Sequence, residues 1–231
     1  KLVDYKKALK IRESIMDPMH PRMLTLRNNM GNLYFAVSAL DEAAESLRIA
    51  YEGRLEKLGS THPWTIGTAT ILISTLVMQD KFEAARELYD AQPEERFDEL
   101  TQLQVWWKQC LLFLLVHEKD ANKALEALDW LLTNSINDLM TAKFRILRGE
   151  ALSMLNKAAD TDQLLGEAFP RVLERFGHGH CETVYYARSV VRTLRGLGRH
   201  SEATSFQRDF IERANQELAE STSEWKHNTR A

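Results

Sequence analysis

Cysteine, proline and glycine are all scarce in this sequence, which holds two, five and ten of them respectively. Cys110 and Cys181 lie far apart and match no zinc or redox spacing, so we expect two small, buried thiols and a reducing, cytoplasmic environment. The few glycines and prolines cluster near a handful of turns. This distribution predicts long helices joined by short loops.

A large charge excess and a long apolar run are missing as well. The formal net charge is −3, so no overall basic field favours nucleic acid as a partner. The longest apolar run, Cys110 to Val116, is far too short to cross a bilayer. Hydrophobic residues make up 44% and charged residues 27% of the chain, which is ordinary for a globular protein. We therefore expect neither a nucleic-acid nor a membrane partner.

One turn-like octet, by contrast, returns along the chain. It reads LGSTHPWT at 58–65, FGHGHCET at 176–183 and MDPMHPRM at 16–23. Gly59 follows a helical pattern and is typical of a helix end. Thr61 is expected to cap the next helix, and Pro63 fits the first turn of that helix. The octet therefore predicts a helix end, a short link and a new helix.

The spacing of the octets indicates an internal repeat. His62 stands 42 residues after His20, and His180 follows 118 residues later, close to three periods of about 40. Small residues recur with a similar period, as expected where two helices of a hairpin cross closely; they are Ala43, Ala84, Ala124 and Ala203, with Thr161 at the missing step. Two independent markers thus predict stacked helical hairpins.

The pattern predicts an all-α chain of antiparallel helix pairs, each burying its apolar side against its neighbours in an α-solenoid. The first helices of the pairs are expected near 22–37, 65–79, 98–117, 138–155 and 182–197, and the second helices near 40–58, 81–91, 121–134, 160–176 and 200–218. Residues 1–16 form a half repeat, because Lys1 shares the register of Ala43. We expect one domain over 1–220, a polar tail over 221–231, and a chain that is part of a longer protein.

The stretch LRNNMGNLYFAVSALDEAAESLRIA resembles a tetratricopeptide repeat, with Gly31, Tyr34, Ala43, Leu47 and Ala50 at its usual spacing of small and large residues. The 42-residue unit and the GSTHPWT link are similar to the kinesin light chain type of that repeat. The resemblance is strong for 1–92, fair for 176–211 and weak between. It implies a right-handed superhelix that binds protein or peptide segments, and similar units occur in sensor arrays of signalling proteins.

In this architecture the first helices line a concave groove, to which the repeat register assigns a set of candidate binding residues. The strongest candidates are Asn28, Asn32, Trp106, Gln109, Tyr185, Arg188, Arg192 and Arg195; the same register adds Ile66, Ala69 and Ile73, then Phe113, then Lys143, Ile146 and Glu150. Asn28 and Asn32 lie four apart on one helix face, as do paired asparagines that grip an extended peptide in light-chain-like repeats. An amide can donate to and accept from a peptide bond at once. The alternative is a pair of solvated or locally capping side chains.

Arg188, Arg192 and Arg195 share a helical stripe, because their spacing is i, i+4, i+7. With Tyr185 they can hold an acidic or phosphorylated segment through bidentate hydrogen bonds. The competing interpretation is a solvated basic face paired with nearby acidic residues such as Glu202 or Glu212. The adjacent Trp106 and Trp107 point about 100° apart on a helix, so we expect at least one of them in the core.

Catalytic signals are weak. GxSxG, P-loop, HExxH and GxGxxG motifs are all missing from the sequence. His178, His180 and Cys181 could ligate a metal, but they span a repeat link and fail the usual four-ligand pattern, so we expect no metal and no cofactor. Cys110 sits in an apolar helix, where a buried, inert thiol is expected. We therefore expect a non-enzymatic binding module, with a structural spacer or self-association scaffold as the main alternative and a helical enzyme as a third.

Overall fold

The computed structural model describes residues 2–92, 102–157 and 163–228, and every element in these ranges is a helix. The first six are α1 (Leu2–Glu13), α2 (Pro21–Ala36), α3 (Leu40–Leu58), α4 (Pro63–Met78), α5 (Phe82–Asp90) and α6 (Gln102–His117). They are followed by α7 (Ala121–Thr133), α8 (Asp138–Met154), η1 (Leu164–Ala168), α10 (Phe169–Phe176), α11 (Cys181–Gly196) and α12 (His200–Asn228). The predicted helix class is confirmed, and most helix boundaries agree to within two residues.

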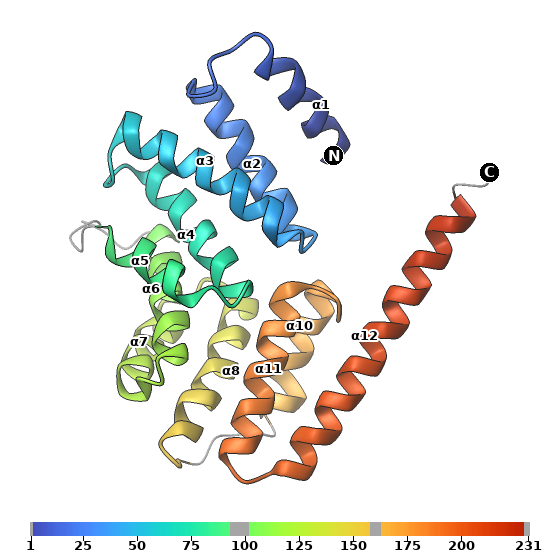
Figure 1. Cartoon of the computed structure of the whole chain (residues 1–231). Coiled ribbons are helices and arrows are strands. Elements are labelled where there is room, and N and C mark those ends of the chain that lie inside the picture. Colours follow the sequence, from blue (N-terminus) through green and yellow to red (C-terminus); the bar gives the residue numbers. More distant parts are fainter. Residues whose placement is uncertain (1, 93–101, 158–162, 229–231) are drawn as a thin grey trace. The chain divides into compact units, whose positions relative to one another are not determined.

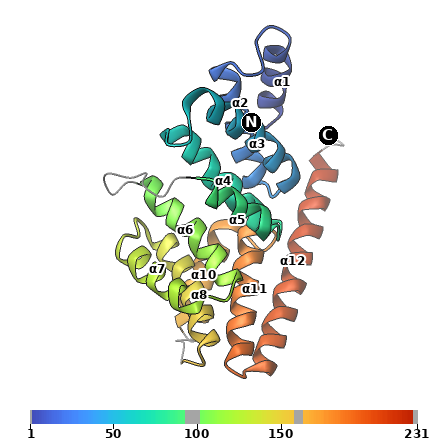
Figure 2. The same cartoon turned by 60° about the vertical axis from the view of Figure 1, so that its left-hand side comes forward.

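The chain divides into two compact units, residues 1–114 and 115–231, which are described separately. In the first unit α1 packs on α2, α2 on α3, α3 on α4 and α4 on α5, with α2 also touching α4 (Figure 1). In the second unit α7 packs on α8, and α8 contacts η1, α10 and α11. α11 also packs on α12, which runs back along α11 and extends beyond its N-terminal end (Figure 2). The packing of successive helices is that of helical hairpins.

Five hairpins close with the same hydrogen-bonded turn. In each, the residue that follows the turn donates its N–H to a carbonyl five residues earlier. The pairs are Ala39 to Tyr34, Lys81 to Leu76, Asp120 to Leu115, Lys157 to Leu152 and Arg199 to Leu194, all at 2.9–3.0 Å. The residue just before each donor has a positive φ: Ser38, Asp80, Lys119, Asn156 and Gly198. Four of these five turns therefore place a side chain in left-handed backbone that only glycine adopts without cost. A geometry this uniform confirms a repeated hairpin.

The buried alanine of each hairpin follows the turn at a fixed distance. Ala43, Ala124 and Ala203 are fully buried, nine residues after the carbonyl acceptor of their turn. In the second hairpin the residue at this place is Ala85, also fully buried, whereas the predicted Ala84 is only half-buried. The prediction of Ala84 was wrong by one position because the Ala-Ala pair is ambiguous in sequence. The predicted counterpart Thr161 lies outside the described residues.

The recurring octet owes its histidine to helix capping. The ring Nδ1 of His20, His62 and His180 accepts the backbone N–H two residues later, at 3.1–3.2 Å, and each histidine is the N-cap of the helix that follows. The prediction of Thr61 as the cap was wrong, because α4 begins at Pro63 and the residue just before it, His62, is the N-cap. Gly59 and Gly177 end the preceding helices with φ of 84° and 76°, as predicted for that position.

Close crossings in both units depend on glycines. A Cβ on Gly31 would lie 2.5 Å from Cγ of Leu47, and a Cβ on Gly149 would lie 2.6 Å from Cδ1 of Leu164. Leu47 is fully buried, so its side chain fills the space that a larger residue at 31 would need. The predicted small-against-large packing between Gly31 and Leu47 is confirmed.

Two regions differ from the predicted pattern. The second helix predicted over 160–176 begins with the π-helix η1 and continues as α10. Pro170 has no backbone N–H, so the normal α-helical bond to residue 166 cannot form there, and the Phe169 N–H bonds to the Leu164 carbonyl instead. The predicted tail over 221–231 is helical as far as Asn228, because α12 runs on without a break.

Candidate binding surface

The predicted groove residues fall into two groups, exposed and buried. Ile66, Ala69, Ile73, Phe113, Ile146, Glu150, Lys143 and Tyr185 are buried. Their assignment to an open groove was wrong. For Ile66, Ala69 and Ile73 part of the cause is a one-residue shift, since the turn register makes Gly67, Thr70 and Ser74 the equivalents of Thr25, Asn28 and Asn32. Of these, Gly67 and Ser74 are half-buried, whereas Thr70 is buried as well. For the buried residues of α8 and α11, the neighbouring first helix covers them.

Asn28 belongs to a polar network that ties three helices of the first unit together. The buried guanidinium of Arg54 on α3 donates through Nη1 to Asn28 Oδ1 at 3.3 Å and to Thr68 Oγ1 at 2.6 Å. The same Nη1 donates to the Trp64 carbonyl at 3.1 Å, and burial lowers the pKa of Arg54. The Asn28 carbonyl oxygen therefore orients a buried cation, while Asn32, four residues on, is exposed. The two asparagines have different surroundings, which the sequence spacing alone does not reveal.

On α6 the two adjacent tryptophans have opposite environments, as predicted. Trp107 is 6% exposed and stacks on Tyr89 with ring centroids 4.6 Å apart, whereas Trp106 is 43% exposed. Gln109, one helical turn after Trp106, is half-buried. Trp106 and Gln109 therefore share an accessible face of α6, which we call the Trp106 face.

Cys110, one helical turn after Trp106 on α6, is buried. Its Sγ lies 3.5 Å from the Thr70 carbonyl and 3.9 Å from Ser74 Oγ, both on α4. Burial raises the pKa of the Cys110 thiol to about 12. A thiol in this state is protonated near neutral pH, which agrees with the predicted inert cysteine.

In the second unit Arg192 of the arginine stripe is joined to one buried acid, Glu150. Arg192 Nη2 donates to Glu150 Oε2 at 3.1 Å, Arg192 Nε donates to Oε1, and Ser189 Oγ donates to the same carboxylate. The Glu150 side chain is 3% exposed and that of Arg192 is 46% exposed, so the pair spans the edge of the α8–α11 interface. Arg195 donates to Gln207 on α12 at 3.1 Å. Arg192 thus bonds to Glu150 and Arg195 to Gln207, while Glu202 forms an ion pair with Arg199.

A second ion pair is buried near the start of the same two helices. Lys143 Nζ donates to both carboxylate oxygens of Glu182 at 2.9 Å, with only 10% and 12% of the two side chains exposed. The ammonium also lies 4.9 Å from the ring centroid of Phe176. Lys143 therefore fixes α8 against α11 and is enclosed by a carboxylate and an aromatic ring, so it does not face a groove.

The His-Gly-His-Cys link serves structure in two ways. His180 caps α11. His178 donates its backbone N–H to Glu217 Oε2 on α12 at 2.9 Å, and its ring Nδ1 is hydrogen-bonded to Oε1 of the same carboxylate. This contact lowers the pKa of Glu217. Within the ranges that the structure describes, no three His, Cys, Asp or Glu side chains gather closely enough to hold a metal ion.

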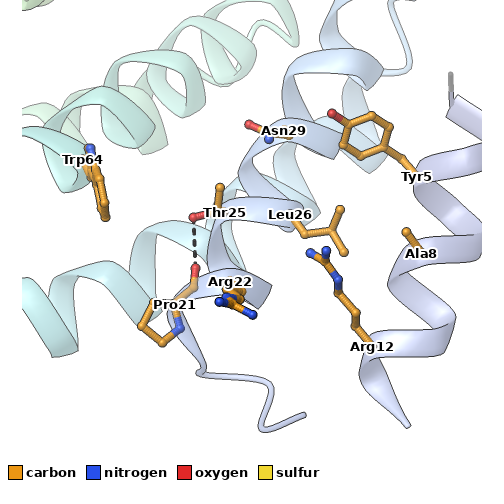
Figure 3. Close-up of a pocket in the computed structure, with 9 residues that line it drawn as sticks. All are labelled: Tyr5, Ala8, Arg12, Pro21, Arg22, Thr25, Leu26, Asn29 and Trp64. Atoms are coloured by element: carbon orange, nitrogen blue, oxygen red, sulfur yellow. Dashed lines mark hydrogen bonds between the residues drawn. The ribbon is translucent and has the colours of Figure 1, made fainter. Parts of the chain in front are cut away.

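A hollow with a volume of about 660 Å³ lies between α1 and α2 in the first unit (Figure 3). Tyr5, Ala8 and Arg12 of α1 form one wall, and Arg22, Leu26 and Asn29 of α2 form the other. Trp64, with 59% of its surface exposed, borders the hollow from the start of α4. We call it the α1–α2 groove. None of these residues was predicted as a site, although the 42-residue offset between α1 and α3 was available in the sequence.

No protein-family model matches the chain, and no curated protein sequence matches it significantly. Among the described helices, none combines the length and apolar character needed to cross a membrane. The interpretation of this protein therefore depends on its own residues.

Proposed function

We propose that this chain is a non-catalytic protein-interaction module, built as a right-handed tetratricopeptide-like solenoid of the kinesin light chain type. Its ligand is a peptide or protein segment that lies across the exposed faces of the first helices. The module serves as the sensor or scaffold part of a larger cytoplasmic signalling protein, alongside other domains of the same chain. No cofactor, nucleic acid or membrane takes part.

The observation that carries this proposal is the Trp106 face. A tryptophan that keeps 43% of its surface in water forgoes much of the free energy that its burial would supply, roughly 25 cal/mol for each Å² of apolar surface. Exposed tryptophans are over-represented among the residues that dominate protein interfaces. Gln109 next to it has both a donor and an acceptor for a peptide bond. Together they offer an apolar anchor and a polar contact on one rigid helix.

The stripe of Arg188, Arg192 and Arg195 is weaker support for an acidic ligand than the Trp106 face is for a peptide ligand. Glu150 already accepts two hydrogen bonds from Arg192, so part of the positive charge of the stripe is neutralised. Arg188 is exposed and adds positive charge to this face, and Arg195 contacts a neutral amide.

A library of displayed random 12-residue peptides would test the proposal directly. The wild-type chain should enrich a consensus sequence, and Trp106→Ala should lose that enrichment at least tenfold. Ile211→Ala is the matched control, since Ile211 is also an exposed large apolar residue, with 49% exposure, but lies on α12. A wild-type chain that enriches no consensus would contradict the function, and enrichment that survives Trp106→Ala would contradict the site.

A structural role in self-association is the second candidate, because two large apolar side chains near the end of α1 are exposed. Ile11 and Ile15 have 63% and 73% of their surface accessible. A scaffold that associates through them should dimerise in a concentration-dependent manner, and Ile11→Ser with Ile15→Ser should abolish the dimer. Static light scattering separates the candidates, since a monomer that enriches peptides excludes pure assembly.

A further inference from the structure

Two exposed tryptophans of the first unit lie on successive first helices. Trp64 stands in the first turn of α4 with 59% of its surface accessible, and Trp106 on α6 has 43% accessible. Gly67 follows Trp64 by three residues, and Leu103 precedes Trp106 by three, so each pair shares a helix face. We call these four residues the Trp64–Trp106 strip.

Contacts between α4 and α6 fix the offset of the two tryptophans. A Cβ on Gly67 would lie 3.8 Å from Leu103 Cδ1, and Cys110 Sγ lies 3.5 Å from the Thr70 carbonyl. Residue numbers rise together in these contacts, so α4 and α6 run in the same direction. One tryptophan stands three residues before the first contact and the other three residues after it, an offset of about 9 Å along the axes. With the axes about 8–10 Å apart, the tryptophan positions are separated by about 12–13 Å.

Trp64 is exposed although both neighbouring first helices are in place. α4 contacts α2 on one side and α6 on the other. The ring of Trp64 is held by the edge of His62, with centroids 5.5 Å apart, and by the Arg54 guanidinium, 5.9 Å from its centroid. A ring that is already ordered loses little conformational freedom when a ligand packs on it.

The surface between the tryptophans is uncharged and open at its centre. Gly67 is half-buried, and within the described ranges a Cβ there would meet only Leu103 outside its own helix. None of the four strip residues carries a charge, in a chain of which 27% is charged. The strip is therefore complementary to an apolar ligand surface, with space for a side chain in front of Gly67.

We propose that the Trp64–Trp106 strip binds an extended segment of a partner protein that presents apolar side chains at three alternate positions. This inference rests on the proposed function and specifies its ligand. An extended chain rises about 3.3 Å per residue, so residues i and i+4 lie about 13 Å apart and face the same side as i+2. The outer two side chains pack on Trp64 and Trp106, and the middle one enters the space in front of Gly67. The intervening residues face away from the strip and are polar.

Two peptides of equal composition test the spacing. The probe is a fluorescein-labelled peptide with the core Leu-Thr-Leu-Thr-Leu between Gly-Ser-Lys flanks, and its control has the core Thr-Leu-Leu-Leu-Thr. Titration with the full chain, followed by fluorescence anisotropy, should give the probe a Kd at least tenfold lower than that of the control. Equal affinities, or a probe whose circular dichroism becomes helical on binding, would overturn the proposal.

Variants of the protein locate the site. Trp64→Ala removes one anchor and Gly67→Leu fills the central space, so each should weaken binding of the probe at least fivefold, whereas Trp64→Phe keeps an aromatic ring and should retain most of it. Val37→Ala is the matched control, because Val37 is also an exposed apolar residue of the first unit, with 61% exposure, but lies at the turn after α2. Thermal unfolding by circular dichroism verifies that each variant is folded.

The outcomes separate this inference from the proposed function. Displayed peptides whose enrichment needs Trp106 but is indifferent to Trp64→Ala and Gly67→Leu would leave the proposed function standing and overturn the strip. A concentration-dependent dimer that Trp64→Ala dissociates would overturn it as well, since the occupant would then be a second copy of the chain.

Discussion

Gly31→Ala tests the packing on which the hairpin depends, because two effects of known sign oppose each other there. Alanine is favoured over glycine inside a helix by about 0.8–1 kcal/mol. The new methyl would lie 2.5 Å from Leu47 Cγ and 2.8 Å from Cδ2, far inside van der Waals contact. Overpacking of this kind costs about 1–3 kcal/mol. Since Leu47 is fully buried and has no free direction in which to move, we expect net destabilisation of about 1–2 kcal/mol.

Gly67→Ala is the matched control on the next first helix. A Cβ there would lie 3.8 Å from Leu103 Cδ1, an ordinary contact, so only the gain in helix propensity remains. We expect this variant to be stabilised by about 0.5–1 kcal/mol, opposite in sign to Gly31→Ala. Urea unfolding followed by far-ultraviolet circular dichroism measures both, and the two midpoints should differ by roughly 1 M if m is about 2–3 kcal/mol/M.

A double-mutant cycle with Leu47→Ala identifies the cause. Leu47→Ala alone opens a cavity and should cost about 2–5 kcal/mol. In that background the Gly31→Ala methyl enters the cavity, so the second change should be neutral or stabilising, with a coupling energy of at least about 1 kcal/mol. Additive costs, or stabilisation by Gly31→Ala alone, would refute the close crossing of α2 and α3.

Three further outcomes are expected. His62→Ala removes the acceptor for the Trp64 N–H and should lower the free energy of unfolding by about 0.5–2 kcal/mol, whereas His62→Asn should restore most of it. Cys110, which is 1% exposed and has a pKa of about 12, should resist iodoacetamide at pH 8 in the native state while Cys181 reacts, as measured by mass spectrometry. Because the His178 contact holds the pKa of Glu217 below its ordinary value, the contribution of this contact is fully present above that value and is lost as pH falls through the lowered pKa; Glu217→Gln should flatten this acid limb of the unfolding curve.

The periodicity of the sequence predicts the helical hairpins because turn chemistry and buried small residues are local and repeat at a fixed distance. Gly59, Gly177 and Ala43 lie where the pattern places them. The error at Ala84 arises because two adjacent alanines satisfy the spacing equally, and only the turn geometry selects Ala85. The histidine caps escaped prediction since histidine is not among the residues favoured at that position.

The candidate surface was less predictable, since exposure depends on what the neighbouring helix covers. Trp106 and Gln109 lie on an accessible face as expected, but Lys143, Tyr185 and Glu150 are buried by the contacts of α8 with α11. Nothing in the spacing of the arginines reveals that Glu150, 42 residues before Arg192, lies beside it.

The uniform hairpin turn restricts where evolution can lengthen or shorten this chain. From the carbonyl acceptor to the buried alanine the distance is nine residues in each hairpin whose alanine is described, yet successive acceptors, Tyr34, Leu76, Leu115, Leu152 and Leu194, stand 42, 39, 37 and 42 residues apart. A single insertion inside the turn would rotate everything after it by about 100° about the helix axis. Indels in this protein and its relatives should therefore accumulate in the links between hairpins, where graft sites for foreign loops are also best placed.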